Sequence, residues 1–156
     1  MSKVVWNEMS KSILPPTWLL IAIVVMVICH FIWPSTRVIT FPWVLVGFLP
    51  IAFGTYLNLA ADKVFKNKHT TVKPFQESSA LVTDGVFRIT RNPMYLGFVL
   101  ILIGLAMLLG SLIPWIVVFV FPILMEKMYI VAEERMLAET FEETWQLYAN
   151  QVRKWI

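Results

Sequence analysis

Residues 93–125 read PMYLGFVLILIGLAMLLGSLIPWIVVFVFPILM, and none of these 33 positions is Asp, Glu, Lys or Arg. One helix of this length would be about 50 Å long, whereas the hydrocarbon core of a bilayer is about 30 Å thick. Gly110, Ser111 and Pro114 lie near the middle of the stretch, and such residues interrupt helices. We therefore expect two membrane helices, at residues 94–109 and 112–132, joined by a tight turn.

Two more uncharged stretches precede this one, at residues 12–36 and 38–61. Each is longer than the roughly 20 apolar residues that one helical span requires, and they predict helices at residues 16–33 and 41–61. Only 15% of all residues are charged, against about a quarter in soluble domains. We expect an all-α integral membrane protein with four transmembrane helices in a single domain, residues 1–156. A soluble globular protein, a disulfide scaffold and a disordered chain are excluded.

The charged residues divide unevenly between the two sides that four spans would create. Twelve of the 13 Lys and Arg residues fall on one side, Lys127 included, and only Arg37 falls on the other. All ten Asp and Glu residues fall on the side of the 12. The positive-inside rule then predicts that both termini and the loop at residues 62–92 are cytosolic, at the inner membrane if the chain is bacterial. Basic residues that flank spans face anionic lipid, so no nucleic-acid partner is expected.

Glycines recur at a helical spacing in the second and third predicted spans. Gly47 and Gly54 are seven residues apart, and so are Gly97 and Gly104. Seven residues are close to two helical turns, so each pair marks one face on which helix backbones can approach closely. Ordinary glycine usage in membrane helices is the alternative explanation.

The sequence after residue 132 predicts a C-terminal amphipathic helix within residues 133–156. It contains no Gly or Pro up to residue 152, and its apolar residues recur every three or four positions. That spacing forms one apolar face of a helix. The helix either continues from the fourth span or lies along the cytosolic interface. The residues of the apolar face are Leu137, Phe141, Trp145, Tyr148 and Val152.

Two polar clusters are expected at the cytosolic membrane surface. The first, at residues 81–95, contains Gly85, which permits close backbone approach, and Arg91, whose planar guanidinium suits a carboxylate. A topology anchor is the simpler explanation for Arg91. The second contains Glu126, Glu133 and Glu134, and acidic residues at the end of a membrane helix are functional candidates. A solvated helix start that pairs with nearby Lys or Arg is the simpler explanation for these carboxylates.

Together the two clusters form an ordered pattern. The first reads Leu81-Val82-Thr83-x-Gly85-x-Phe87 and then Arg91-Asn92-Pro93-x-Tyr95-x-Gly97. The second begins with Glu133-Glu134-x-x-Leu137 and continues with Phe141, Glu143, Trp145, Tyr148 and Val152. From about residue 70 onward, the chain resembles isoprenylcysteine carboxyl methyltransferases and the related phospholipid methyltransferases.

The resemblance implies an integral membrane fold, S-adenosylmethionine as methyl donor and S-adenosylhomocysteine as product. The methyl acceptor would be a lipophilic small molecule or lipid-modified group, with isoprenylcysteine-type carboxyl methylation as the family example. The cofactor would enter from the cytosol and the acceptor from the bilayer, whose lipids are expected partners. The loop at residues 62–92 and the helix at residues 133–156 would form the rim of the cofactor site.

The resemblance also assigns roles to individual residues. Arg91, Glu133 and Glu134 would be catalytic, with Arg91 orienting a carboxylate of either the cofactor or the substrate. Substrate binding is assigned, on weaker grounds, to Glu126, Trp145 and Arg153. The residues expected to bind the cofactor are Leu81, Val82, Gly85, Arg91, Asn92, Pro93, Tyr95, Glu133 and Glu134.

The chain departs from the family pattern within the C-terminal helix. Members usually carry Gly where this chain has Glu142, and frequently Arg where it has Gln151. Gln151 in place of Arg argues against a carboxylate as the methyl acceptor. The expected reaction is an in-line displacement of a sulfonium methyl group without a covalent enzyme intermediate.

Two other interpretations remain open beside a methyltransferase. A non-enzymatic four-helix membrane scaffold or assembly protein would show no affinity for S-adenosylmethionine. A nicotinamide-dependent membrane reductase has less support, because the chain lacks the glycine-rich phosphate loop that such an enzyme needs. No metal is expected, because His30 and His69 have no partner at ligand spacing.

Overall fold

The computed structural model describes residues 14–33, 37–68 and 80–156, and the regular elements within these ranges are helical. The expected all-helical fold is therefore confirmed. The elements are α2 (Pro15–Ile32), the 3-10 helix η2 (Trp43–Gly47), α3 (Phe48–Asn67), the 3-10 helix η3 (Gly85–Arg88), α4 (Pro93–Leu109), α5 (Pro114–Met125), the π-helical stretch η4 (Glu126–Ile130) and α6 (Val131–Gln151).

Three helical stretches are long and apolar enough to cross a membrane: Pro15–Ile32, Trp43–Asn67 and Pro114–Gln151. The second runs six residues past its expected end at residue 61. The extra residues include Asp62 and Lys66, which form an ion pair at 2.6 Å one helical turn apart and suit a helix that emerges into water. α4 is also apolar but has only 17 residues.

The turn between α4 and α5 forms where the sequence predicts it. Gly110 adopts φ 68°, a left-handed conformation that glycine accepts without strain and that ends many helices. Pro114 then begins α5. The carbonyl of Gly110 accepts hydrogen bonds from the backbone N–H groups of Val38 and Ile39, and His30 shares a 2.6 Å hydrogen bond with the buried Ser111. The segments around α2 and α3 are thereby tied to this end of the bundle.

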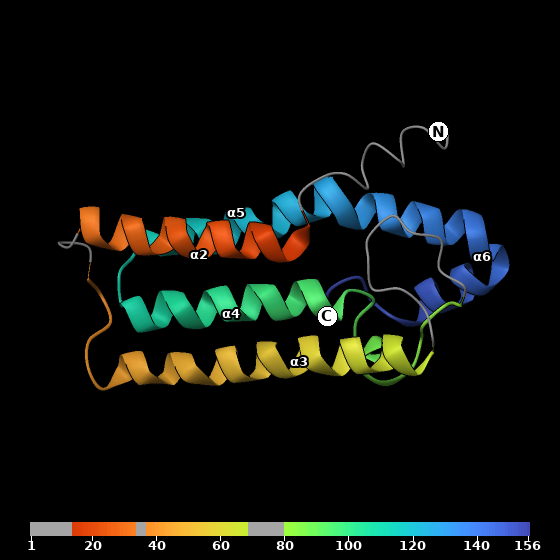
Figure 1. Ribbon diagram of the computed structural model, residues 1–156, viewed down its shortest axis with the longest axis horizontal. Coiled ribbons are helices and arrows are strands. Elements are labelled where there is room, and N and C mark those ends of the chain that lie inside the picture. The colour runs from red at the N-terminus through yellow and green to blue at the C-terminus, as the bar shows by residue number, and fades with distance from the viewer. Residues whose placement is uncertain (1–13, 34–36, 69–79) are drawn as a thin grey trace.

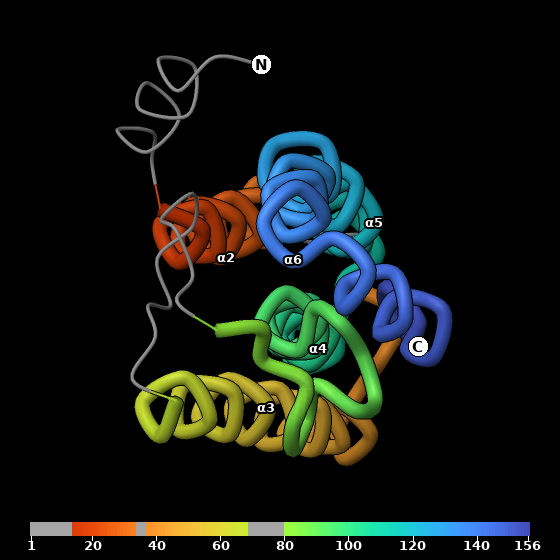
Figure 2. The backbone as a smooth tube through the Cα atoms, turned by 90° about the vertical axis from the view of Figure 1, so that its right-hand side faces the viewer, coloured from red at the N-terminus to blue at the C-terminus, as the bar shows by residue number. Residues whose placement is uncertain are grey.

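α4 is the central helix of the bundle. In Figure 1, α2, α3 and α4 run alongside one another, and the view along their axes in Figure 2 shows α4 between α3 on one side and α2 with α5 on the other. The four glycines lie where η2 and α3 pack against α4, which confirms their expected packing role. A Cβ atom on Gly54 would meet the carbonyl oxygen of Gly97, and one on Gly47 would meet that of Gly104.

The surface of the bundle is apolar, whereas its centre is closely packed. Met26, Leu102, Ala106 and Met125 are completely buried between the helices. Many large apolar side chains point outward instead, as they do in proteins whose solvent is lipid. Examples are Phe31, Phe41, Trp43, Leu49 and Phe119, each more than two-thirds exposed.

The C-terminal helix follows one of the two arrangements expected for it. α5, η4 and α6 follow one another without a gap, so the helix continues from the predicted fourth span and does not start anew at residue 133. α6 then bends at Glu142, which has φ 41° and ψ −113°. Figure 1 shows α6 extending beyond the other helices and turning back, so that the C-terminal end lies beside the start of α4. The bend creates a first limb, residues 131–141, and a second limb, residues 143–151.

Candidate functional site

The site is built around the start of α4, where Arg91 and Asn92 precede Pro93. Pro93 occupies the first turn of the helix, where its missing N–H is not needed. The segment before it is held against α3 by Val86 and Phe87, which are both buried. Gly85 has φ 61° and allows the tight turn that leads into η3. The chain therefore enters α4 along a fixed path, and the side chain of Arg91 is directed at α6.

Arg91 is held by both limbs of α6. Its Nη1 donates a hydrogen bond of 2.9 Å to the carbonyl oxygen of Ala149 in the second limb. Its guanidinium carbon lies 5.6 Å from the centre of the Trp145 ring, within the range of a cation–π contact. Its Nε lies 3.1 Å from Oε1 of Glu134 in the first limb. Arg91 thus joins the helix start to both arms of a folded helix.

Glu134 is the carboxylate at the centre of the cluster, with 18% of its side chain exposed. Its Oε2 lies 3.4 Å from Nζ of Lys154, and its Oε1 faces Arg91. Despite the short distance, neither Oε1 of Glu134 nor Nε of Arg91 has a hydrogen-bond partner within the described residues. The two atoms therefore form a buried ion pair whose alignment is not that of a hydrogen bond, and each could form a better-aligned hydrogen bond with a charged ligand that separates them.

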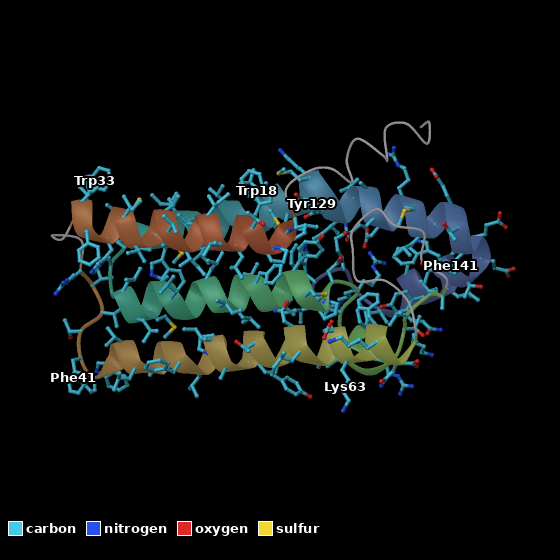
Figure 3. The ribbon with its side chains drawn as sticks, viewed as in Figure 1. Trp18, Trp33, Phe41, Lys63, Tyr129 and Phe141 are labelled. Carbon is cyan, nitrogen blue, oxygen red and sulfur yellow. The ribbon has the colours of Figure 1, made fainter. Side chains whose placement is uncertain are left out.

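Glu133 has a different partner. Its Oε1 accepts a hydrogen bond of 3.0 Å from the hydroxyl of Tyr95, which belongs to the first turn of α4. The Tyr95 ring stacks on Tyr129 with 6.5 Å between ring centres. The Tyr129 hydroxyl accepts a hydrogen bond of 3.1 Å from Nε1 of Trp18 in α2, and Figure 3 shows these two side chains beside each other where α2 meets η4. The two neighbouring glutamates therefore face different sets of groups.

The π-helical stretch η4 contributes to this arrangement. A π turn adds one residue to a helix and shifts the face on which the following residues lie. Pro122, one turn earlier, already lacks the N–H that an α-helix needs at that position. Within η4, Tyr129 and Ile130 are adjacent in sequence and both almost completely buried. π stretches occur frequently at functional sites, and here one lies directly before Glu133.

Lys154 lies after the end of α6 and completes the charged cluster. Its Nζ donates a hydrogen bond of 3.0 Å to Oε1 of Glu126, besides its contact with Glu134. The hydrogen bond to Glu126 raises the pKa of Lys154 above its usual value, and the charge of Glu134 acts in the same direction. Lys154 is therefore a permanent cation at neutral pH. Along the cluster, Arg91, Glu134, Lys154 and Glu126 alternate in sign.

The backbone of the tail is fixed independently of this ammonium group. The carbonyl of Lys154 accepts hydrogen bonds from Oγ1 of Thr90 at 3.0 Å and from Nδ2 of Asn92 at 3.1 Å. The carbonyl of Arg153 accepts one from the backbone N–H of Arg91 at 3.0 Å. The hydroxyl of Tyr148 donates to the carbonyl of Phe87 at 2.7 Å. Four hydrogen bonds thus join the second limb and the tail to the segment before α4.

The residues singled out from the sequence fall into three groups. Side chains that meet directly or through Lys154 are those of Arg91, Glu126, Glu134 and Trp145, while Tyr95 and Glu133 form a neighbouring pair. Three further residues hold the surrounding backbone. Asn92 donates a hydrogen bond to the tail, Pro93 begins α4, and the carbonyl of Arg153 accepts a hydrogen bond from the backbone of Arg91. Val82 instead packs with Leu57 and Ala61 of α3, and a Cβ atom at Gly85 would meet Val64 of the same helix. The expected cofactor contacts of Leu81, Val82 and Gly85 stay a prediction.

The sequence analysis missed Lys154 and Tyr129. The basic residues of the tail, Lys154 among them, were interpreted as determinants of membrane topology. Lys154 is also 28 residues from Glu126 in sequence, so no helical spacing relates the two. The balance of charges at the predicted site could have indicated Lys154, because three glutamates at one membrane surface need more counter-ions than Arg91 alone. Tyr129 follows the regular spacing of a buried helix face, which does not distinguish a site from a core.

The arrangement offers paired charges and hydrogen-bonding groups at the end of an apolar bundle, without a typical metal centre. Among the described residues, no group of three or more His, Cys, Asp or Glu side chains could hold a metal ion. The site contains three carboxylates, a guanidinium, an ammonium and a tyrosine hydroxyl, which suit a ligand that carries both charges and hydroxyl groups.

Comparison with known proteins gives one match. A family model described as phospholipid methyltransferase matches residues 42–144, which include α3, α4, α5, η4 and most of the first limb of α6. No curated protein and no solved structure matches the chain.

Proposed function

Because the chain belongs to the phospholipid methyltransferase family, we propose that it transfers a methyl group from S-adenosylmethionine to a lipophilic acceptor. The observation that carries the proposal is the buried meeting of Arg91 and Glu134 at the end of an apolar helical bundle. Their facing atoms, Nε and Oε1, have no hydrogen-bond partner among the described residues. We place the site on the cytosolic side and the bundle in the bilayer, with α2, α3, α4 and α5 as its four spans.

The residues of the cluster fit the groups of S-adenosylmethionine. This ligand carries a carboxylate, an ammonium, a sulfonium and ribose hydroxyls. Glu134 offers an acceptor for an ammonium or a hydroxyl and Arg91 offers a donor, once a ligand separates the poorly aligned pair that these two atoms form. Charge-assisted hydrogen bonds of this kind are the strongest that a protein forms without a metal. Glu133 and Tyr95 add a second acceptor and a hydroxyl one helical turn inside the bundle.

When bound, S-adenosylmethionine would supply an electrophilic methyl group on its sulfonium. The chain's own contribution would be to hold two molecules that arrive from different phases. Arg91 and Glu134 would fix the charged ligand at the rim, while the buried aromatic side chains of Tyr95 and Tyr129 would exclude water from the inner part of the site. Alignment of two reactants accounts for a large part of many enzymatic rate accelerations. A dry environment favours this reaction further when the acceptor is an anion, because charge disappears in the transition state.

The lipophilic nature of the acceptor follows from the surroundings of the site. Exposed apolar side chains lie on α2 (Leu20 and Ile28) and at the start of α6 (Val131), so a molecule that approaches between these helices comes from the bilayer. Trp145, Glu126 and the backbone of Arg153 border the opposite, polar side of the cluster. Carboxyl methylation of an isoprenylcysteine type is the family example for such an acceptor.

A non-enzymatic membrane scaffold is the alternative. It would use the Arg91–Glu134 pair to lock α6 onto α4 and would need no free hydrogen-bonding capacity there. The family match favours the methyltransferase, and so does the poor alignment of the pair, because a buried ion pair with a purely structural role is stabilising only when its geometry is excellent.

Binding of S-adenosylhomocysteine to the purified full chain tests the proposal. Isothermal titration calorimetry in detergent or nanodiscs should give saturable one-site binding, and S-adenosylmethionine should compete with it. NADPH serves as the control ligand. If the folded chain binds neither S-adenosylhomocysteine nor S-adenosylmethionine, the scaffold is the better explanation.

A further inference from the structure

We propose that Lys154 is a positioning residue for this site: its ammonium group holds the Glu134 carboxylate through Oε2 and leaves Oε1 to Arg91, and to the ligand once the ligand draws Arg91 away. The inference rests on the proposed function, because it concerns how the methyl-donor site is kept ready. It assigns a role to a residue outside the matched family region, which ends at residue 144.

The first argument is the division of the Glu134 oxygens. Lys154 contacts Oε2 at 3.4 Å, whereas Oε1 faces Arg91 and has no hydrogen-bond partner among the described residues. A cation that blocked the site would compete with Arg91 for Oε1, with which Arg91 forms an ion pair at 3.1 Å. Lys154 instead approaches from the other side, and its shorter contact of 3.0 Å goes to Glu126. Glu126 therefore anchors the ammonium, which in turn supports the carboxylate of Glu134.

The second argument is electrostatic. Glu134 and Arg91 have 18% and 14% of their side chains exposed, and a poorly hydrated carboxylate is costly unless cations surround it. Binding of a ligand through Arg91 would draw that guanidinium partly away from Glu134. Lys154 then remains as the counter-ion of the carboxylate, so the site keeps its charge balance while Arg91 changes partners.

The third argument is that the tail holds Lys154 through its backbone. Thr90 and Asn92 both donate to the carbonyl of residue 154, and Arg91 donates to that of residue 153. These hydrogen bonds do not involve the ammonium group. A Lys154→Met substitution should consequently keep the tail where it is and remove only the charge, which separates positioning from folding.

Calorimetric titration of S-adenosylhomocysteine and S-adenosylmethionine into Lys154→Met and Lys154→Arg tests the inference. We expect Lys154→Met to weaken both ligands by about tenfold, which corresponds to about 1.4 kcal/mol. Lys154→Arg keeps the charge and should bind within about threefold of the unmodified chain, or about 0.65 kcal/mol. If Lys154→Met fails to fold, Lys154→Met with Glu126→Gln removes one charge of each sign and should show the same loss.

Several outcomes would overturn the inference. Unchanged affinity in Lys154→Met would remove any role for the ammonium. Tighter binding, above all of the sulfonium-bearing ligand, would mean that Lys154 competes with the ligand for the carboxylates. A loss in Lys154→Arg as large as in Lys154→Met would show that charge is not what matters. Failure of the unmodified chain to bind either ligand is a separate result, which would overturn the proposed function and this inference with it.

A double-mutant cycle distinguishes action through Glu134 from a general effect of the tail. If Lys154 acts by positioning Glu134, Lys154→Met should cost little additional affinity once Glu134→Gln is present, because residues in one network are not additive. Fully additive losses would contradict the inference, even if each single variant binds weakly.

Discussion

The hydroxyl of Tyr95 donates a hydrogen bond of 3.0 Å to Oε1 of Glu133, and this contact separates two glutamates that are adjacent in sequence. Glu133 is engaged by a neutral hydroxyl inside the bundle, whereas Glu134 lies among the charges of Arg91 and Lys154. The sequence presents the two as an equivalent pair. Their different surroundings lead to different expectations for their substitution.

Glu134→Gln should weaken S-adenosylhomocysteine binding by about ten- to a hundredfold, because a charge-assisted hydrogen bond contributes about 1.5–3 kcal/mol. Glu133→Gln should cost less, since a glutamine oxygen can still accept the hydrogen bond from Tyr95. Calorimetric affinities of both variants, with thermal unfolding of the ligand-free proteins as control, provide the comparison. Two folded variants with unchanged affinity would contradict the binding role of both carboxylates.

Arg91→Lys should lose most of the ligand affinity although it keeps the positive charge. A lysine cannot donate at the same time to the carbonyl of Ala149 and toward Glu134, and it lacks the flat face that lies near Trp145. We expect a loss of at least tenfold in affinity for S-adenosylhomocysteine, about 1.4 kcal/mol. The exposed Arg88, three residues earlier, is the matched control, and Arg88→Lys should bind normally. Equal affinities of the two variants would remove Arg91 from the site.

Gly104→Ala should destabilise the bundle without touching the site. A Cβ atom there would meet the carbonyl of Gly47 and the side chain of Ile51, and overpacking of this kind costs about 1–3 kcal/mol. The midpoint of unfolding in detergent should fall accordingly. Ala52→Leu adds a larger group on the exposed side of α3 and serves as control. A Gly104→Ala protein as stable as the unmodified chain would show that the close packing of α3 and α4 is not required.

Single cysteines test the proposed orientation in the membrane. In a Cys29→Ser background, a cysteine at Thr40 should react with an impermeant maleimide added outside intact cells, whereas one at Asn67 should react only after permeabilisation. The two positions lie at opposite ends of the η2–α3 helix and are both exposed. The expectation follows from the excess of basic residues on the Asn67 side. The reverse labelling pattern would overturn the proposed topology.

Much of the fold could be predicted because bilayers leave a chain few options. A chain without charges over residues 93–125 must form helices, and Gly110 and Pro114 mark where they break. Helix ends in the aqueous region were less predictable. The second helix continues to Asn67 because no residue in its last turn opposes helix formation. Its end was predicted at residue 61 because hydropathy identifies only the part of a helix that lies inside the membrane.

The site could be predicted where its charged residues lie at the ends of the expected spans or belong to the family pattern. Arg91 and the glutamates were found in this way, and the structure brings them together. Lys154 was not found, because its role depends on the return of the chain after the bend at Glu142. That bend has no signature in periodicity, since the apolar spacing from Leu137 to Val152 continues through it. It does coincide with the position where family members usually carry glycine.

Glu142 should therefore be a site of stored backbone strain. Its φ of 41° lies in a region that side chains with a Cβ atom avoid, and such residues cost about 1–3 kcal/mol each. Glu142→Gly should relieve part of that cost and raise the free energy of unfolding by about 1 kcal/mol, despite the greater entropy of glycine in the unfolded chain. Glu139→Gly, in the regular part of α6, is the matched control and should destabilise by about 1 kcal/mol. Chemical denaturation in the same detergent measures both variants. If the two substitutions were equally destabilising, residue 142 would be an ordinary helical position, and the return of the tail to Arg91 would need another cause.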